Sequence, residues 1–356
     1  MRHGISVYWL STKLAQRVQK GKRQNILGKQ RIGFDIGESS VKMVLVAGTE
    51  IKNAVTADLP DHMVENGSIL SMDAMADFIR TQAKAHHLPK AEAAVILPAS
   101  TIFVRTITVP VMTEQQLLFN LPFEFKDYLT EEKRNYLFDY AVLEMLPDEA
   151  GQPHELRLLA CAVHKEIIEA YRSMFKRAGF KLKLAVPQEC AYTNLIRRLD
   201  PAIGQDCCIA DIGHSGTRLH LFHQREYATV RNVDIGMRAL DEIIAAVQEV
   251  DVHMAHTYKE SNYNQVLESD DAQRLYSSLA VEMAKAVNFF NYNNRDAQLE
   301  DIYLCGGGAC IAPLTRAIEE ATHMQVHQAA ALMPPLQQPE DAYHFLQGYG
   351  LAIGEK

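Results

Sequence analysis

The chain has 356 residues, enough for two domains or for one large fold with insertions. Its 47% hydrophobic and 22% charged residues are typical of an ordinary globular protein, which excludes low-complexity sequence, and no apolar run approaches the ~18 residues that a membrane span needs. Charge is uneven, because residues 1–31 hold eight Lys or Arg and no acid, which leaves 28 bases against 44 acids in the remainder.

The amino-terminal tail, residues 1–30, is the basic part of this asymmetry. Residues 5–18 place apolar and aromatic side chains, including Tyr8 and Trp9, ahead of a cluster of Lys and Arg. Such rings suit the headgroup zone of a bilayer, and each base near an anionic leaflet contributes on the order of 1 kcal/mol. We therefore hypothesise peripheral membrane contact through the tail. An unstructured tail and a start codon assigned too early are the alternatives.

A strand, a tight turn and a second strand are predicted over residues 32–46. The first strand ends in Asp35, and the turn contains Gly37, Ser39 and Ser40. Glycine lets the backbone approach a ligand closely, and successive N–H groups and hydroxyls form a nest for an anion such as phosphate. A carboxylate just before the bend would be repelled by phosphate, but it can hold Mg²⁺ through water. We predict a phosphate turn here.

The same pattern returns at residues 208–222. The positions that match are Asp35/Asp211, Ile36/Ile212, Gly37/Gly213, Ser39/Ser215 and Leu45/Leu221, with a base shared at Lys42/Arg218. One Asp-x-Gly turn alone would carry little weight, because Asp and Gly also favour ordinary β-turns. Two copies in matching strand contexts indicate a duplicated phosphate turn. Two unrelated hairpins with similar turn chemistry are the alternative.

A helix is predicted next, because apolar residues recur at helical spacing from Leu275 to Phe290. The aromatic cluster at its end, residues 289–292, favours packing over a platform for stacking bases. We therefore predict no nucleic-acid partner.

A third turn follows a short apolar strand at residues 301–305. It consists of Gly306, Gly307 and Gly308, and a helical pattern follows at 313–320. Three glycines at a strand-to-helix junction allow flat backbone contact with a ring or a ribose. A flexible connector is the alternative, but a connector would not need a buried strand directly before it.

The cysteines and histidines indicate no metal or disulfide chemistry. The six cysteines include no Cys-x-x-Cys pair, and the fourteen histidines have no metal-ligand spacing. We expect reduced cytoplasmic thiols that fill apolar space.

Taken in order, the three turns resemble those of the actin, Hsp70 and sugar-kinase superfamily. Within it, the chain resembles the type IV pilus assembly proteins of the PilM family, relatives of the cell-division protein FtsA. Residues 32–42 look like that family's first signature almost residue for residue, and the likeness covers about residues 31–356. The resemblance implies an α/β, actin-like (ASKHA) two-lobed fold with duplicated ribonuclease H-like cores and an FtsA-type inserted subdomain.

The resemblance also implies a division of the chain. It predicts a basic tail (1–30), the first core lobe (31–107), an inserted α/β subdomain (108–183), a second part of the first core lobe (184–205), the second core lobe (206–235), an outer helical subdomain (236–299), a second part of the second core lobe (300–340) and the terminal helix of the first lobe (341–356). In the insertion we expect a helix at 165–177 that is closed by Gly179.

By the same resemblance, ATP or ADP binds with Mg²⁺ between the lobes. The expected nucleotide contacts are Gly37, Ser39, Ser40, Lys42, Gly213, Ser215, Gly216, Thr217, Gly236, Lys259, Gly306, Gly307 and Gly308, and Asp35 and Asp211 are expected to hold magnesium through water. Two positions depart from the family. Met237 replaces the second glycine of a pair, where its side chain would crowd the phosphates, and His256 replaces the acid of a Glu-x-x-Lys contact. Lys259 is either an adenosine contact or a solvated helix base.

The function implied is that of a nucleotide-loaded scaffold, cytoplasmic and peripheral at the inner face of the inner membrane. It would receive the amino-terminal peptide of the inner-membrane protein PilN in a groove between the first lobe and the insertion, together with other pilus inner-membrane or motor components. Leu117, Leu121 and Phe125 are candidates for the groove and equally for helix packing.

A sugar or small-molecule kinase of the same superfamily is the alternative function. It would need a carboxylate to orient the acceptor, for which Asp139 is the only passable candidate. No catalytic residue is identified, so we expect ATP binding and at most slow hydrolysis.

Overall fold

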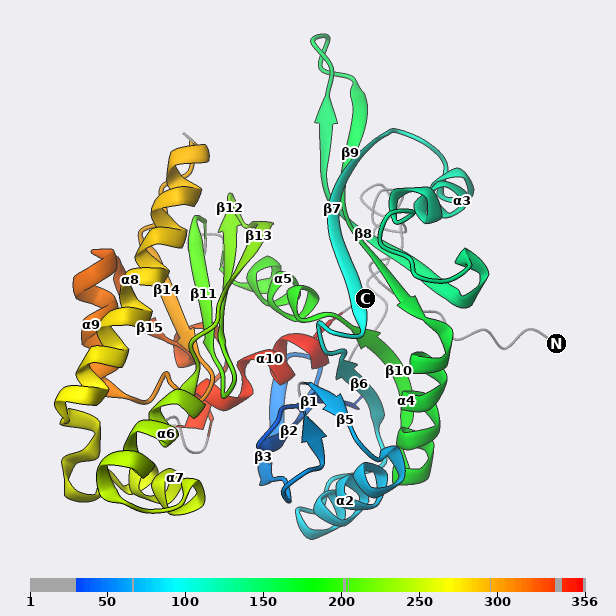
Figure 1. The fold of residues 1–356 in the computed structure, drawn as a ribbon. Helices are drawn as coiled ribbons and strands as arrows, with labels where there is room; N and C mark the ends of the chain where they lie inside the picture. The colour runs from blue at the N-terminus through cyan, green and yellow to red at the C-terminus, as the bar shows by residue number, and fades with distance from the viewer. Residues whose placement is uncertain are drawn as a thin grey trace. The chain divides into compact units, whose positions relative to one another are not determined.

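The computed structural model describes residues 30–65, 67–200, 203, 205–294, 296–336 and 341–354. They form two compact units: unit 1 contains residues 30–195 and 347–354, and unit 2 contains residues 196–346 (Figure 1). Except for Gln30, the predicted basic tail lies outside the described residues. Within the described ranges, no helix is both long and apolar enough to cross a membrane.

Unit 1 is built on a five-stranded sheet. In spatial order, its strands are β10 (Lys181–Val186), β6 (Glu92–Ile96), β1 (Gln30–Ile36), β2 (Ser40–Ala47) and β3 (Glu50–Asp58). Strands β1, β2 and β3 form an antiparallel meander, and β6 and β10 add in parallel next to β1. The middle of β1 and most of β2 are buried, which explains their near-continuous apolar sequence.

Unit 2 repeats this topology. Its strands, in spatial order, are β13 (Glu226–Val233), β12 (Thr217–His223), β11 (Cys207–Ile212), β14 (Asp301–Cys305) and β15 (Gln325–Gln328). Again three antiparallel strands are followed by two parallel ones. The register agrees as well, because Asp35 pairs with Lys42 in unit 1 and Asp211 pairs with Arg218 in unit 2. Both predicted hairpins are confirmed, and the units share one strand order.

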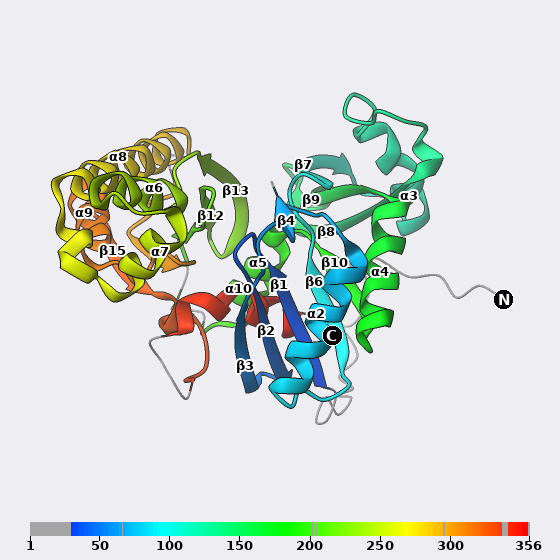
Figure 2. The ribbon, with the colours of Figure 1, turned by 60° about the horizontal axis from the view of Figure 1, so that its bottom comes forward.

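Apart from α3 (Glu114–Glu124), which belongs to the insertion described below, four of the described helices belong wholly or partly to unit 1. They are α2 (Met72–Ala85), α4 (Lys165–Ala178), α5 (Gln188–Arg198) and α10 (Ala342–Ala352). Helices α2 and α4 pack side by side (Figure 2). As predicted, α4 is closed by Gly179, which adopts a left-handed φ of 94°. The division between the units falls inside α5 and inside α10, and the subdomain limits implied by the resemblance stay predictions.

Two glycines bring α10 against the sheet of unit 1. A Cβ atom on Gly33 of β1 would lie 2.0 Å from the carbonyl oxygen of Gly348. Because no side chain fits in that space, glycine at this position of β1 permits the close approach of strand and helix.

A three-stranded antiparallel sheet is inserted between β6 and β10. Its order is β7 (Ile102–Pro110), β9 (Pro153–His164) and β8 (Tyr136–Pro147), with α3 (Glu114–Glu124) and a 3₁₀ turn η1 (Lys133–Asn135) between β7 and β8. Asp139 lies on β8 opposite Cys161. A two-stranded ribbon, β4 (Val64–Glu65) and β5 (Ser68–Ile69), precedes α2.

Helix α3 packs its inner face into the core of this insertion. The side chains of Leu117, Leu121 and Phe125 are at most 2% exposed and contact β-strand residues such as Leu158. Of the two interpretations of these residues, helix packing is therefore confirmed, and they do not line an open groove.

Along the chain, most helices of unit 2 lie between consecutive strands of its sheet. They are α6 (Met237–Gln248), α7 (Val252–Ser261), η2 (Tyr263–Glu268) and α8 (Asp270–Asn293) before β14, then α9 (Ala312–Thr322) before β15 and η3 (Ala329–Leu332) after it. Helices α8 and α9 pack against each other (Figures 1 and 2). Helix α8 confirms the predicted periodicity, because Leu279, Met283 and Val287 are buried. In the aromatic cluster Phe290 is buried, whereas Phe289 and Tyr292 are exposed.

Five of the six cysteines are buried, and Cys310 is exposed. Burial raises the pKa of the Cys207 thiol to about 12, and the pKa of Cys208 is raised by burial as well. These thiols stay protonated at neutral pH, as expected of small apolar side chains in a core.

Candidate functional site

The first predicted phosphate turn joins β1 to β2 in unit 1. The amide of Gly37 donates to the carbonyl oxygen of Ser40 at 3.0 Å, which closes the turn. Ser39 is exposed at the bend, whereas Ser40 is 7% exposed. The Lys42 ammonium lies beside the turn, because a Cβ atom on Gly37 would be 3.4 Å from Lys42 Nζ. The turn thus presents a cation and an exposed hydroxyl close to its glycine.

Asp35, near the end of β1, is held by the buried amide of Gln347, which Gln188 in turn supports, and sequence reasoning missed both residues. In the orientation that satisfies its neighbours, the Gln347 amide nitrogen donates to both Asp35 carboxylate oxygens, at 3.0 and 3.1 Å, and its oxygen accepts from Gln188 Nε2. Gln347 and Gln188 are 7% and 5% exposed. The amide side chain of Gln347 within the largely apolar helix α10 was the available signal. The carboxylate is therefore fixed in direction before any ligand arrives.

The second turn, between β11 and β12, carries the same backbone bond. The Gly213 amide donates to the Gly216 carbonyl oxygen at 3.0 Å, and Ser215 is exposed. Thr217 is 1% exposed, and its hydroxyl donates to the carbonyl oxygen of Ile235 at 2.8 Å. To contact a phosphate, as predicted, Thr217 would have to give up that bond.

The corner between β13 and α6 is packed directly on this turn. A Cβ atom on Gly236 would lie 2.4 Å from both the Gly216 nitrogen and the His214 oxygen. The amide of Met237 donates to the Gly213 oxygen at 2.9 Å, so the first turn of α6 is tied to the second phosphate turn. The side chain of Met237 is 3% exposed and packs in the core of unit 2. Its sulfur reaches the triple-glycine turn, since a Cβ atom on Gly308 would lie 3.1 Å from Met237 Sδ, and crowding of a bound phosphate by this side chain stays a prediction.

The triple-glycine turn meets the end of β11. Gly306 has a φ of 79°, and its Cβ would lie 2.6 Å from Asp211 Oδ1; a Cβ on Gly308 would lie 2.3 Å from Ile212 Cγ2. These two glycines are needed for packing. Gly307 is exposed with no atom within 4 Å of its Cβ position, so it offers the open backbone face that a ligand could approach.

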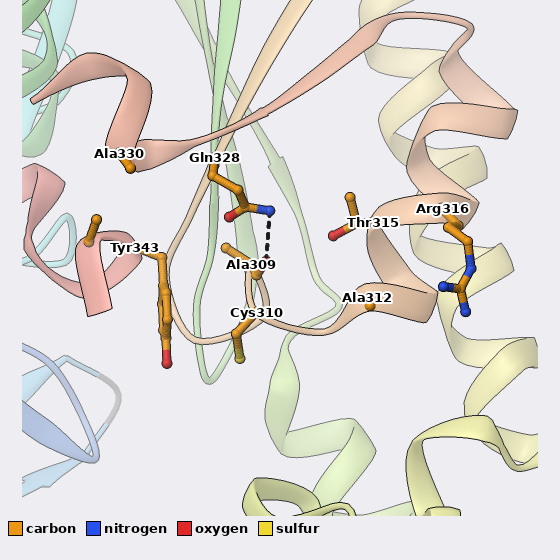
Figure 3. A pocket seen from close by; sticks show the side chains of 9 residues that line it. Ala309, Cys310, Ala312, Thr315, Arg316, Gln328, Ala330 and Tyr343 are labelled. Atoms are coloured by element: carbon orange, nitrogen blue, oxygen red, sulfur yellow. Dashed lines mark hydrogen bonds between the residues drawn. The ribbon is translucent and has the colours of Figure 1, made fainter. Parts of the chain in front are cut away.

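A cavity of 460 Å³ follows the triple-glycine turn within unit 2, and Figure 3 shows its lining side chains. They come from the turn before α9, the first half of α9, the end of β15, η3 and the start of α10: Ala309, Cys310, Ala312, Thr315, Arg316, Gln328, Ala330, Ala342 and Tyr343. The Gln328 amide donates to the Ala309 oxygen at 3.3 Å. Small and apolar walls with a few polar groups, at this volume, are typical of small-molecule sites. Sequence reasoning did not find the cavity, because its residues are scattered over residues 309–343.

Lys259 on α7 is neither solvated nor unpaired. Its ammonium lies 2.7 Å from Asp241 Oδ1 of α6, and the two side chains are 10% and 1% exposed. His256 Nδ1 lies 3.4 Å from the other carboxylate oxygen. The solvated-base interpretation is therefore wrong, and contact with adenosine stays a prediction.

Electrostatics in this cluster keep Asp241 ionised. Burial acts to raise the pKa of Asp241, but the hydrogen bond from His256 and the charge of Lys259 outweigh it, and the net pKa is lowered. In return, the hydrogen bond to Asp241 raises the pKa of His256. His256 and Lys259 thus share one buried carboxylate.

The described ranges contain no cluster of three or more His, Cys, Asp or Glu side chains that could hold a metal ion by itself. A single carboxylate in each turn fits a magnesium ion held mainly by phosphate and water. Asp35 and Asp211 lie in different units, and their sharing of one ion stays a prediction.

Comparisons with known proteins agree with this architecture. The family model described as type IV pilus assembly protein PilM matches residues 33–337. Comparison with curated protein sequences gave no match. Among solved structures, a PilM-PilN type IV pilus biogenesis complex is similar with a TM-score of 0.77 and 21% identity, over 91% of this chain and 97% of that chain.

Two further structures share the fold at lower similarity. The ethanolamine utilization protein EutJ from Carboxydothermus hydrogenoformans has a TM-score of 0.56 and 15% identity, over 91% of this chain and 89% of that one. MreB5 of Spiroplasma citri bound to ADP has a TM-score of 0.50 and 12% identity, over 91% and 95%. The predicted actin-like α/β fold is confirmed. With its family model matched over residues 33–337, the chain belongs to the family of type IV pilus assembly protein PilM.

Proposed function

We propose that the chain is a nucleotide-binding scaffold of the type IV pilus assembly machine, placed at the cytoplasmic face of the inner membrane, and that it binds the amino-terminal peptide of PilN. The observation that carries the nucleotide part is the convergence in unit 2 of the second phosphate turn, the triple-glycine turn and the 460 Å³ cavity. Membership of the PilM family and the likeness to a PilM-PilN complex support the pilus part.

The residues present suit a magnesium nucleotide. Gly307 leaves the backbone open beside Asp211 and Ile212, and the adjoining cavity has room for a purine base next to Tyr343. In the first turn, the Lys42 ammonium supplies positive charge for phosphate, and Asp35 is fixed by Gln347. Magnesium would neutralise phosphate charge when bound. The chain's own part is to orient carboxylates and present amides, which is binding rather than catalysis.

The PilN part of the proposal concerns an extended peptide held in a groove between the first core lobe and the insertion. Leu117, Leu121 and Phe125 are excluded as groove residues because they are buried. Nucleotide would act on this groove by favouring one conformation over another, as far as its affinity differs between them.

Titration calorimetry tests both parts with the full chain, MgATP, MgADP and a synthetic peptide of the PilN amino terminus. We expect Asp35→Ala and Asp211→Ala each to weaken magnesium-dependent nucleotide binding by at least about tenfold, since a group that orients a metal is worth that much. Glu50→Ala, which removes an exposed carboxylate at the start of β3, is the matched control. Unchanged nucleotide affinity in both variants would remove the site, and absence of peptide binding with and without nucleotide would remove the PilN role.

A further inference from the structure

Helix α3 is apolar on two faces, only one of which is used inside the insertion. Leu117 and Leu121 are buried, whereas Leu118, Phe119 and Phe123 are 42%, 70% and 55% exposed. We call these three residues the outer face of α3. An amphipathic helix on a core normally turns polar side chains outward, so an apolar outer face indicates a surface that another segment covers.

The outer face is a continuous ridge. The rings of Phe119 and Phe123 lie 6.1 Å apart between centroids, and Lys133 Nζ lies 4.6 Å from the centroid of Phe123. Two neighbouring aromatic rings present a large apolar area at low conformational cost, which is typical of contact sites for a short apolar segment.

We propose that residues 5–10 of the same chain dock on the outer face of α3. This segment contains Ile5, Val7, Tyr8, Trp9 and Leu10, the apolar and aromatic part of the tail. It lies outside the described residues and before residue 33, where the family match begins. The proposal does not depend on nucleotide or on PilN.

The charges around α3 and in the linker favour residues 5–10 as the occupant of its outer face. Helix α3 carries two acids, Glu114 and Glu124, and no base. The exposed segment after it carries the acids Asp127, Glu131 and Glu132 and the bases Lys126, Lys133 and Arg134. Residues 11–29, which adjoin the docking segment, carry six bases and no acid. With these five acids against three bases, the surface has a net negative charge, which attracts a basic linker and keeps the apolar segment close.

The length of the chain between residues 5–10 and Gln30 also favours this segment as the occupant of the outer face of α3. Nineteen residues separate Leu10 from Gln30 and span roughly 60 Å when extended. A unit of about 170 residues has a radius of gyration of roughly 16 Å, so any surface of unit 1 is accessible to the segment. Because segment and surface belong to one chain, the effective concentration is in the ~mM range, so even a weak intrinsic affinity leads to substantial occupancy.

The test uses fluorescence of Trp9, the only tryptophan in the chain. In the full chain at low concentration, we expect blue-shifted emission and protection from acrylamide quenching. The double variant Phe119→Ser/Phe123→Ser should lose both the shift and the protection, with circular dichroism unchanged because both side chains are exposed. Phe289→Ser is the matched control, because Phe289 is 54% exposed in unit 2, and it should retain both.

Four results would overturn the proposal. Trp9 could be as accessible in the full chain as in the double variant. Its protection could persist in the double variant, which would place the segment elsewhere. Protection that disappears on dilution would show docking on a second copy of the chain. Protection that appears only with anionic phosphatidylglycerol vesicles would show that the segment binds a membrane instead.

Discussion

The two phosphate turns share a sequence pattern and a backbone bond, but their surroundings differ. The turn of unit 2 is enclosed by its neighbours: Gly236 and Gly306 each leave no room for a Cβ atom. The turn glycines themselves have similar surroundings, since a Cβ would lie 3.2 Å from its nearest atom on Gly37 and 3.0 Å on Gly213. In unit 1, however, the carboxylate is held by the side chain of Gln347. The two copies of the turn are thus stabilised in different ways: the turn of unit 2 by closely packed backbone, and that of unit 1 by hydrogen-bonded side chains.

This difference means that the same type of mutation should act differently in the two units. Where backbone atoms surround a glycine, an added methyl group cannot be accommodated by a rotamer change, so stability suffers. Where a side chain fixes the carboxylate, its loss should affect ligand binding more than folding.

The largest effect is expected for Gly236→Ala in the second turn. The new Cβ would meet backbone atoms of Gly216 and His214 at 2.4 Å, and we expect a loss of about 3 kcal/mol in the free energy of unfolding. Urea denaturation followed by circular dichroism measures it. Gly307→Ala is the matched control, with an expected change within about 0.5 kcal/mol because its Cβ position is open. Equal stability of the two variants would contradict the enclosed second turn.

An intermediate effect on stability is expected for one buried position on the second strand of each hairpin, which is β2 in unit 1 and β12 in unit 2. Buried Val44 on β2 corresponds by the duplication to buried His220 on β12. Burial, and then the charge of Arg218, lowers the pKa of His220 to about 3. Between the unfolded value of ~6.5 and the folded value, the unfolded state binds the extra proton, so stability falls as the pH falls.

From pH 6.5 to pH 5 this histidine should lower the free energy of unfolding by about 2 kcal/mol. His220→Val, which installs the residue of unit 1, should remove that part of the pH dependence. Urea denaturation of both proteins at the two pH values compares the slopes, and parallel slopes would show that His220 is not the titrating group.

The smallest effect on folding is expected for Gln347→Leu beside the first turn. Loss of its hydrogen bonds to the Asp35 carboxylate should lower the free energy of unfolding by about 1 kcal/mol. Magnesium-dependent binding of ATP should weaken, while binding without magnesium stays unchanged, since only the direction of the carboxylate is lost. Calorimetry at several magnesium concentrations separates the two. An equal loss with and without magnesium would make Gln347 a purely structural residue.

Local pattern was enough to predict the hairpins and the main helices. The strands that carry Asp35 and Asp211 near their ends, the helix through Leu279 and Met283, and the glycine that closes α4 all have causes within a few residues. The family resemblance added the actin-like arrangement, which no local periodicity contains.

What the sequence did not reveal depends on contacts between distant segments. Gln347 approaches Asp35 across more than 300 residues, and Asp241 neutralises Lys259 from another helix. The inward packing of Met237 follows from how α6 starts on the Gly213 turn, and the identity of the residue does not specify it. Likewise, apolar spacing in α3 could not tell the buried Leu117 from the exposed Leu118.

The matching backbone bonds of the two turns, from Gly37 to Ser40 and from Gly213 to Gly216, have a consequence for isotope exchange. Both glycine amides are occupied before any ligand arrives, so they should be protected from deuterium in the unliganded protein. A bound anion must be recognised by other hydrogen-bond donors near each bend. The two glycine amides can therefore report whether each turn stays closed while those donors change.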